Sequence, residues 1–446
     1  MNLSGKRVVV IGLGASGAAA AKLCARRGGL VVGNDSKQRE QLGEVAEELE
    51  QAGVALSFGQ HDLGAIAAAD VIVLSPGVPP FAALDEAERR GAIVIGELEL
   101  AVSSLEHRAP IVCIGGTNGK STTTSLIGEM LEKSGKAVFV GGNLGEPLSN
   151  RVDQKFDAIV LEVSSFQLER LRTFHPRVSV LLNVTPDHLD RYADFGAYAD
   201  AKGNAFVRQT AADTAVVPFG DAICERQAKR GGAQIVSFGA SGDFVVTDNS
   251  IEDRKNGVVY DRAAMAIQGG HNALNAAAAL AAVAAMGVVG ETNRASLKDF
   301  HGLPHRMRFV AEIDSVRYYD DSKGTNVGAS VTALRGLREP KAVLIAGGRD
   351  KHTGYDDLVA ALRERGRAAV VIGEAADAIE VAIGGAIPVV RAASMAEAVK
   401  RSAELAKSGD AVLLSPACSS YDMFRDYAHR GREFAAAVSA LNGGDR

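Results

Sequence analysis

Tryptophan is absent from this 446-residue chain, and cysteine occurs only four times. The cysteines are scattered and have neither metal-ligand spacing nor a pairing pattern; they are Cys24, Cys113, Cys224 and Cys418. This scarcity excludes a small domain held together by disulfides and argues against a zinc module. We therefore expect reduced thiols in a cytoplasmic protein.

Long apolar runs and blocks of one charge are also missing. No apolar run approaches the roughly 18 residues that a membrane span needs. Lysine and arginine number 49 against 54 aspartates and glutamates, a net charge of -5 without a basic block. We therefore expect no nucleic-acid partner and no membrane span, and we expect a monomer. The start of the chain has some features of a signal peptide, but its spaced glycines and Lys22 favour a folded strand, turn and helix.

A glycine-rich segment carries the clearest signal for chemistry. Residues 115–122 read GGTNGKST and stand between an expected strand, Ile111 to Ile114, and an expected helix, Thr122 to Lys133. Such a turn directs N–H groups at a phosphate, while Lys120 reaches the terminal phosphates and Ser121 coordinates Mg²⁺. The loop is one residue tighter than the commonest spacing, and the alternative is a glycine turn without a ligand. The predicted ATP-binding residues of this loop are Gly116, Thr117, Asn118, Gly119, Lys120, Ser121 and Thr122.

The first segment of the chain predicts a second nucleotide site. A strand at Arg7 to Ile11 is followed by GLGASG, with Gly12, Gly14 and Gly17, and Asp35 stands 18 residues after Gly17 at the end of the next strand. This is the spacing of a dinucleotide-binding fold, in which glycines admit a diphosphate and the acid meets a ribose hydroxyl. Any nucleotide diphosphate fits that turn, so NAD stays open as an alternative.

Polar residues follow two further apolar strands. Glu162 comes after the run Ala158 to Leu161, where a P-loop protein keeps its Mg²⁺ ligand; the alternative is a glutamate that caps a helix. After the run Val178 to Leu182, a loop presents Asn183, Asp187, His188 and Asp190, and a solvated His188 is the alternative to a metal ligand. Asn272 and Asn275 begin an alanine-rich helix, where they read an adenine edge or cap the helix.

The last segment alternates strand and helix patterns, which predicts another doubly wound parallel sheet. Its four expected strands lie in VRYYDD (316–321), KAVLIAGG (341–348), AAVVIG (368–373) and AVLLSP (411–416). Three polar clusters follow its strands, at 320–326, 347–351 and 415–424, and we expect them at one sheet edge as a ligand face. The chain therefore predicts three α/β domains, at 1–108, 109–301 and 302–446.

The motifs together resemble those of the Mur ligases of peptidoglycan synthesis. In family order they read GTNGKST, LEVSSFQLE, NVTPDHLDRY, YADAK, GGHNALNA, LPHRM, DDSKGTN and LLSPACSSYDMF with RGREF. The resemblance implies a Rossmann-like N-terminal domain that binds a UDP substrate, a central P-loop ATPase domain, and a C-terminal domain that binds an amino acid. It also implies ATP-driven amide formation between UDP-MurNAc-L-Ala and D-glutamate through an acyl phosphate.

The resemblance further implies roles for matched positions. Ser121 and Glu162 would hold one Mg²⁺, and His188 would hold a second together with Lys202 as a carbamate, unless Lys202 is a plain surface lysine. The remaining ATP contacts would be Asn272, Asn275, Arg306 and Asp321. The UDP-substrate contacts would be Gly14, Ala15, Ser16, Asp35, Ser36, Lys37, Gly77 and Asn143. The D-glutamate contacts would be Thr325, Lys351, Ser420, Tyr421 and Tyr427.

Two positions of the amino-acid pocket depart from the family pattern. The acid before Lys351 is shifted by one, in Arg349-Asp350-Lys351, and Tyr427 stands where phenylalanine is usual. Two other functions stay open: another amide ligase of the superfamily, such as a folylpolyglutamate synthetase or a different Mur ligase, and an NAD-dependent dehydrogenase. The chain lacks the Asp-Asn-Pro-Arg motif of the diaminopimelate-adding ligase, and a folate ligase would not need the GLGASG domain.

Overall fold

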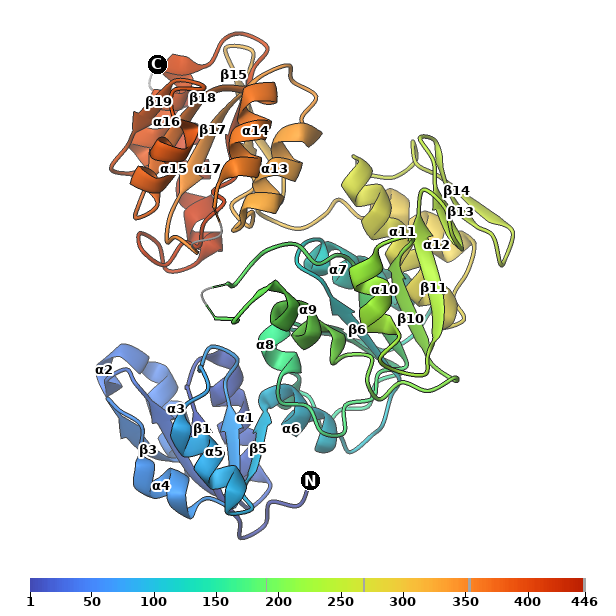
Figure 1. Ribbon diagram of the computed structural model, residues 1–446, viewed down its shortest axis with the longest axis vertical. Helices are drawn as coiled ribbons and strands as arrows, with labels where there is room; N and C mark the ends of the chain where they lie inside the picture. Colours follow the sequence, from blue (N-terminus) through green and yellow to red (C-terminus); the bar gives the residue numbers. More distant parts are fainter. Residues whose placement is uncertain (190, 268, 352–353, 444–446) are drawn as a thin grey trace. The chain divides into compact units, whose positions relative to one another are not determined.

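The computed structural model describes residues 1–189, 191–267, 269–351 and 354–443. It contains three α/β sheets, of five, nine and six strands, each flanked by helices (Figure 1). By their contacts, the residues form two compact units. The first unit comprises 1–184, 196–265 and 273–300, and the second comprises 185–195, 266–272 and 301–446. The three sheets confirm the predicted fold class.

The N-terminal sheet is parallel throughout, with the order β3-β2-β1-β4-β5. The chain crosses over on both sides of β1, so the turn after β1 lies at the point where the strand order reverses, which is where such sheets bind ligands. The elements are β1 (Arg7–Ile11), α1 (Ala15–Arg26), β2 (Leu30–Asp35), α2 (Arg39–Leu42), α3 (Glu44–Gln51), β3 (Ala55–Phe58), α4 (Leu63–Ala68), β4 (Val71–Leu74), α5 (Ala82–Arg89), β5 (Ile93–Gly96) and α6 (Glu97–Ser103).

The central sheet has the order β14-β13-β12-β11-β10-β9-β6-β8-β7. The strands from β7 to β12 run parallel, whereas β12, β13 and β14 pair antiparallel, an extension that the sequence patterns did not indicate. The elements are β6 (Ile111–Gly115), α7 (Lys120–Lys133), β7 (Val138–Gly142), η1 (Leu148–Asn150), β8 (Ala158–Glu162), α8 (Ser165–Leu168), β9 (Val178–Leu181), α9 (Phe195–Gly203), β10 (Thr214–Pro218), α10 (Ala222–Ala228), β11 (Gln234–Gly239), β12 (Phe244–Val246), β13 (Ser250–Asp253), β14 (Val258–Asp261), α11 (Gly270–Ala285) and α12 (Glu291–Asp299).

The C-terminal sheet has the order β15-β16-β20-β17-β18-β19, and only β15 runs antiparallel to its neighbour. The four predicted strands are β16, β17, β18 and β20, while β15 and β19 were not predicted. The elements are β15 (Arg308–Ile313), β16 (Val316–Asp320), α13 (Val327–Gly336), β17 (Ala342–Gly347), α14 (Asp356–Arg365), β18 (Gly366–Ile372), α15 (Ala376–Ile383), β19 (Val389–Arg391), α16 (Met395–Leu405), β20 (Ala411–Leu414) and α17 (Tyr427–Gly443).

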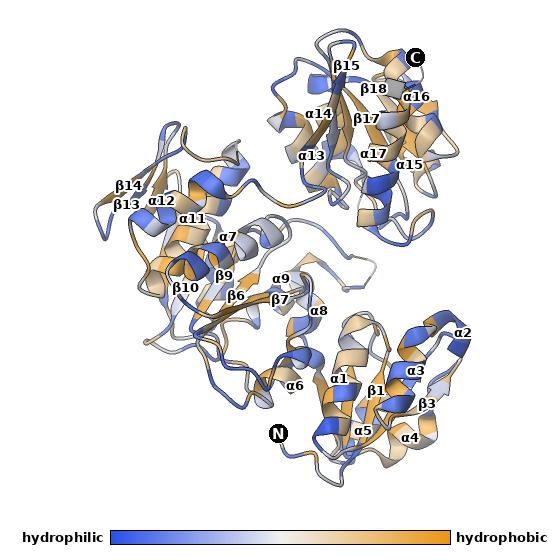
Figure 2. Cartoon of the chain, turned by 180° about the vertical axis from the view of Figure 1, so that it is seen from behind, coloured by the Kyte–Doolittle hydropathy of each residue, from blue (hydrophilic) through white to orange (hydrophobic). Residues whose placement is uncertain are grey.

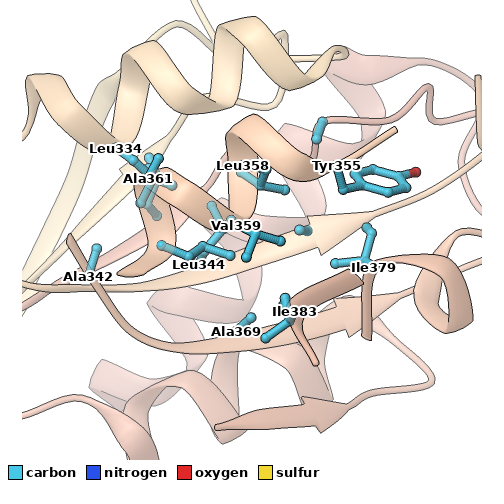
Figure 3. Packing of buried hydrophobic residues seen from close by; sticks show 14 of the residues in the cluster. Leu334, Ala342, Leu344, Tyr355, Leu358, Val359, Ala361, Ala369, Ile379 and Ile383 are labelled. Carbon is cyan, nitrogen blue, oxygen red and sulfur yellow. The ribbon is translucent and has the colours of Figure 1, made fainter. Parts of the chain in front are cut away.

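Both faces of the C-terminal sheet are buried, which explains why its strands read as nearly continuous apolar runs. On one face, Leu344 and Ala369 pack against α13, α14 and α15 (Figure 3). On the other face, Val343 and Val370 pack against α16 and α17. Figure 2 shows the same contrast by colour, with apolar strands between helices whose outer faces are polar. In the part of the chain that the structure describes, no helix is both long and apolar enough to cross a membrane.

Candidate active site

The predicted phosphate loop leaves the carboxyl end of β6, between β8 and β9 in the sheet order. Helix α7 begins at Lys120, two residues earlier than predicted, and Gly119 precedes it with a φ of 86°. A Cβ on Gly119 would lie 2.3 Å from Asn275 Oδ1. Only glycine fits that backbone and that space, so the loop is built to turn tightly into the helix.

The side chains of Lys120 and Asn183 fix the conformation of the phosphate loop. Lys120 Nζ donates hydrogen bonds to the carbonyl oxygens of Gly116 and Thr117, at 3.0 and 2.8 Å. Asn183 accepts a hydrogen bond from the N–H of Asn118 and donates one to its carbonyl oxygen. These contacts fix the conformation of the loop and keep an ammonium beside it at the start of a helix, where proteins commonly bind phosphate.

Glu162 ends β8 and pairs in register with Ile114 of β6, so its carboxylate stands at the same sheet edge as the phosphate loop. Asn143 Nδ2 donates to Glu162 Oε1 at 2.7 Å. The capping alternative for Glu162 is wrong, because Ser164 caps α8 in a capping box with Gln167. Glu162 therefore does not cap α8, and its carboxylate lies at the loop edge in contact with Asn143.

The oxygen donors of this edge suit Mg²⁺ better than a softer metal. Within the described ranges, no three His, Cys, Asp or Glu side chains gather closely enough to hold an ion alone. Mg²⁺ is usually held by one or two carboxylates together with substrate phosphates and water. Ser121 at the start of α7 and Glu162 at the end of β8 fit that requirement.

Lys202, on α9, is buried with 3% of its surface exposed, so the alternative of a plain surface lysine is wrong. Its Nζ donates to the carbonyl oxygen of Gly116 at 2.8 Å and lies 4.5 Å from the centre of the Tyr198 ring. The Tyr198 hydroxyl in turn is 3.1 Å from Thr117 Oγ1. The YADAK segment therefore lies directly against the phosphate loop.

The polar loop after β9 lies in the compact unit of the C-terminal sheet from Thr185 onward. His188 has a φ of 55°, and its N–H donates to the Asp187 carboxylate. Asp187 is 4% exposed, and its two oxygens contact Lys351 Nζ at 3.1 Å and Asn326 Nδ2 at 3.2 Å. Asp190 lies outside the described residues. The structure thus shows that Lys351 binds a carboxylate, although not one that the sequence predicted.

The first glycine turn is held by the predicted ribose acid. Asp35 Oδ2 accepts from the N–H of Leu13 at 2.6 Å, and Oδ1 accepts from the N–H of Lys37 at 2.8 Å. Gly12 has a φ of 83°, and a Cβ on Gly17 would lie 1.7 Å from the carbonyl oxygen of Gly12. The start of α1 therefore packs directly on the turn. Gly14, Ala15 and Ser16 form the N-terminal end of α1, and backbone N–H groups at a helix N-terminus are suited to binding an anion.

The three polar clusters of the last segment lie at one edge of the C-terminal sheet. Strands β16, β20 and β17 are parallel neighbours, with Leu414 in register with both Asp320 and Ile345, so the loops that follow them leave from the same edge. Ser420 is buried, Thr325 is half-buried, and Tyr421 is 65% exposed. The prediction that the three clusters share one sheet edge is therefore confirmed.

The two departures from the family pattern have structural partners. The Asp350 carboxylate accepts a hydrogen bond from the Tyr355 hydroxyl at 2.8 Å, so Tyr355 holds the side chain of the shifted acid in place. The Tyr427 ring meets His305 edge to face at 6.3 Å and has Lys323 Nζ 5.0 Å from its centre. Both side chains therefore make contacts with neighbouring residues of the C-terminal unit.

Arg306 and Asp321 carry opposite charges and lie on loops beside the same sheet edge. Burial raises the pKa of Asp321 to about 6, while hydrogen bonds from Ser415 and the N–H of Met307, and the charge of Arg306, act against that rise. Arg306 Nε is buried and has no hydrogen-bond partner among the described residues. An unsatisfied buried donor costs about 1–3 kcal/mol, which a bound phosphate oxygen would recover.

We expect the substitution Asp321→Asn to stabilise the fold above neutral pH. The raised pKa means that the contribution of Asp321 to stability is complete below its ordinary value of 3.8 and is lost as the pH rises through about 6. That shift corresponds to roughly 3 kcal/mol. Denaturant unfolding at pH 4.5 and 7.5 measures the difference, which should grow with pH. The exposed Asp314→Asn is the control, and a gain in Asp321→Asn that does not depend on pH would contradict this account.

Three residues of the site were not assigned from sequence. Tyr198 and Asn183 hold the phosphate loop, and both lie inside motifs that the sequence displays without indicating which side chain faces the loop. Arg430 is 0% exposed and contacts all three loops of the C-terminal edge. The sequence feature that could have indicated Arg430 is an arginine, in RGREF, on a helix face that is otherwise apolar.

Comparison with known proteins agrees along the whole chain. Residues 6–96 match the N-terminal domain of MurD-like Mur ligases, residues 114–283 the Mur ligase middle domain, and residues 305–418 the glutamate ligase domain of Mur ligases. The chain is 43% identical to the UDP-N-acetylmuramoylalanine–D-glutamate ligase of Desulfosudis oleivorans, over 99% of this chain and 97% of that protein. It is 42% identical to the protein of the same name from Geotalea daltonii, over the full length of both.

Solved structures share the fold at lower identity. UDP-N-acetylmuramate-alanine ligase MurC from Thermotoga maritima matches with a TM-score of 0.63 at 18% identity, over 98% of this chain and 100% of that one. MurF ligase from Thermotoga maritima, in complex with ADP, matches with a TM-score of 0.63 at 18% identity, over 92% and 95%. Fold and site together define a three-domain ligase that uses a nucleoside triphosphate. The chain belongs to the Mur ligase family.

Proposed function

We propose that this Mur ligase joins D-glutamate to the L-alanyl carboxylate of UDP-MurNAc-L-Ala and hydrolyses ATP to ADP and phosphate. The observation that carries the proposal is the match, over nearly the full length of both chains, to relatives named for this reaction, at 42–43% identity. The product would be a precursor of peptidoglycan, and we propose that the reaction takes place in the cytoplasm, which the nucleotide substrates support.

The chemistry starts from a poor electrophile. A carboxylate resists attack by an amine, so one of its oxygens first attacks the γ-phosphorus of ATP, and ADP leaves. The amine of D-glutamate then attacks the carbonyl carbon of the acyl phosphate, the tetrahedral intermediate collapses, phosphate leaves, and the amine loses its proton to solvent. Catalysis of the first step is mainly positioning and charge stabilisation.

The residues of the central domain supply that stabilisation. The turn from Gly116 to Gly119 and the N–H groups at the start of α7 would cradle the phosphates, and Lys120 would stabilise the charge that moves onto the β–γ bridge. Ser121 and Glu162 would hold Mg²⁺, which neutralises phosphate charge when it is bound. Asn275 lies against Gly119, which supports a place for it and Asn272 near the nucleotide.

Lys202 is proposed to act as a carbamate. Its uncharged amine would add to CO₂ and release a proton, giving an anion where the lysine had a cation. The buried place of Lys202 against Gly116 supports this role, because an anion there would help to hold Mg²⁺ beside the phosphate loop. A cation in the same place would repel that ion.

The outer domains bind the two joined molecules. We assign the UDP moiety to the turn of the N-terminal sheet, where Gly14, Ala15 and Ser16 begin α1, Asp35, Ser36 and Lys37 stand at the end of β2, and Gly77 follows β4. Asn143, after β7 of the central sheet, would lie near the sugar and the lactoyl-alanine. We assign D-glutamate to Thr325, Lys351, Ser420, Tyr421 and Tyr427. The contact of Lys351 with the Asp187 carboxylate supports that pocket, because the same ammonium would meet a carboxylate of glutamate.

Phosphate release tests the proposed function. With ATP and Mg²⁺ present, we expect release only when both UDP-MurNAc-L-Ala and D-glutamate are added, because the acyl phosphate forms on one and is consumed by the other. Calorimetry should show binding of UDP-MurNAc-L-Ala and no heat with NAD. Phosphate release in the absence of either substrate would contradict the proposal. Tight NAD binding would favour a dehydrogenase.

A further inference from the structure

Arg430 is the largest side chain among the described residues that are fully buried. It lies in the first turn of α17, three residues after Tyr427, and 0% of its surface is exposed. Arginine is rarely buried completely unless its charge and its donors are satisfied. Its surroundings therefore require an explanation beyond packing.

The Arg430 guanidinium donates to three different segments of the C-terminal sheet edge. Nε and Nη2 donate to the hydroxyl and the carbonyl oxygen of Ser322, at 3.0 and 2.9 Å, in the loop after β16. Nη1 donates to the carbonyl oxygen of Gly347 at the end of β17, at 3.4 Å. Both Nη atoms reach the carbonyl oxygen of Cys418, at 3.2 Å, and Nη1 reaches that of Ser419 at 3.3 Å, after β20.

These bonds hold a cation that forms no ion pair, although the charges of Asp422, Asp320 and Asp321 favour its protonated form. Among the described residues, no carboxylate lies within ion-pair distance of Arg430, and its partners are backbone carbonyls and one hydroxyl. Burial lowers the pKa of Arg430 to about 10, so the group is still charged at neutral pH. Burying an unpaired charge is costly. An apolar side chain would fill the space at lower cost, so the hydrogen-bonding geometry is the feature that distinguishes arginine here.

The contacted segments are those that carry the predicted amino-acid pocket. Thr325 stands three residues after Ser322, Lys351 four residues after Gly347, and Ser420 directly after Ser419. Because the carbonyl oxygens of these segments turn inward to one guanidinium, their spacing from one another is set by a single rigid group. A planar fork of five donors is suited to this, and a flexible ammonium is not.

We propose that Arg430 is a positioning residue for the amino-acid substrate: it fixes the three loops so that Thr325, Lys351 and Ser420 form one pocket. This inference rests on the proposed function, since it takes those three residues as the pocket. The guanidinium itself is buried behind the loops and touches no substrate. Its effect is on where the pocket residues stand, and a misplacement of about 1 Å in such a group can cost on the order of 100-fold.

Steady-state kinetics of Arg430→Lys test the proposal. Lysine keeps the charge but cannot bridge the three segments, so we expect KM for D-glutamate to rise about 10- to 100-fold. KM for UDP-MurNAc-L-Ala should stay within about twofold, because its proposed contacts lie on the other sheets. KM for ATP should rise less than KM for D-glutamate, because only Arg306 and Asp321 among its proposed contacts lie beside the C-terminal sheet. Arg432→Ala, an exposed arginine on the same helix, is the matched control and should leave all three constants unchanged. An unchanged KM for D-glutamate in Arg430→Lys, or an equal rise in all three, would overturn the proposal.

Amide hydrogen exchange gives a second test that needs no catalysis. In the whole protein without substrates, Arg430→Lys should speed exchange at residues 321–326, 347–351 and 417–420, while β17 and β18 keep their protection. Unchanged exchange in all three segments would overturn the proposal, as would loss of protection throughout the C-terminal sheet. If the wild-type enzyme prefers another amino acid, the proposed function fails, whereas this exchange pattern and the KM for the preferred acceptor still decide the role of Arg430.

Discussion

Replacing Lys120 with alanine is expected to lower ATP-dependent phosphate release by roughly 100- to 1000-fold without unfolding the protein. The Lys120 ammonium is held at the phosphate loop by the carbonyl oxygens of Gly116 and Thr117, so its charge is already in place when charge develops on the departing phosphate. Losing such a preorganised contact acts on the rate of the chemical step more than on substrate binding.

Circular dichroism and a phosphate-release assay measure the two parts of this prediction. Lys133→Ala is the control, because Lys133 ends the same helix and pairs with Glu129 and Asp299 at the surface. Surface pairs of this kind contribute little to stability. A folded Lys120→Ala protein with near-normal release would remove the basis for assigning ATP to this loop.

Replacing Lys202 with alanine is expected to lower the rate by at least about 100-fold, with partial recovery when a short carboxylate such as acetate is added. Lys202 is buried against Gly116, and acetate would return a carboxylate to the cavity that alanine leaves. A role in packing alone would give no recovery with acetate. The carbamate also predicts that wild-type activity falls when CO₂ is removed and returns with bicarbonate.

Lys229→Ala serves as the control for this series, because Lys229 is an exposed lysine of the central domain. It should retain full activity and show no response to acetate. Full activity of Lys202→Ala would show that the lysine has no part in the reaction. A wild-type enzyme indifferent to CO₂, together with a Lys202→Ala variant that acetate does not restore, would reject the carbamate.

Much of this fold could be predicted from local sequence motifs. Each of the glycine turns after β1 and β6 follows an apolar strand, requires glycine for steric reasons and leads into a helix. These three features give recognisable residue types at fixed spacing in the sequence. The parallel strands β17, β18 and β20 are buried on both faces, so their apolar runs are continuous. Their common edge then follows from the connection rules of parallel sheets.

Other parts of the structure depend on contacts between residues far apart in the chain. The antiparallel strands β13 and β14 have four residues each, with polar residues among them, so their patterns were too short to indicate strands. The bond from Asn143 to Glu162 and the six bonds of Arg430 join separate segments, which no local spacing reveals. The burial of Lys202 likewise depends on tertiary packing.

Selectivity for D-glutamate follows from the charge of the proposed pocket. The second carboxylate of glutamate must leave water, and Lys351, Thr325 and Ser420 offer one cation and two hydroxyls to receive it. A neutral side chain would leave those groups unpaired, and sites of this kind reject such analogues by roughly 10,000-fold in favourable cases. L-glutamate should be poor because inversion at the α-carbon moves the amine away from the acyl phosphate.

One labelling experiment tests the central claim most directly. UDP-MurNAc-L-Ala that carries ¹⁸O in its carboxylate is incubated with ATP, Mg²⁺ and a mixture of D-glutamate, L-glutamate, L-alanine and meso-diaminopimelate, and the products are resolved by mass. The proposed reaction predicts a product heavier by one D-glutamyl residue and one ¹⁸O atom in each phosphate released. Phosphate without the label, or preferential addition of any other acceptor in the mixture, would contradict it.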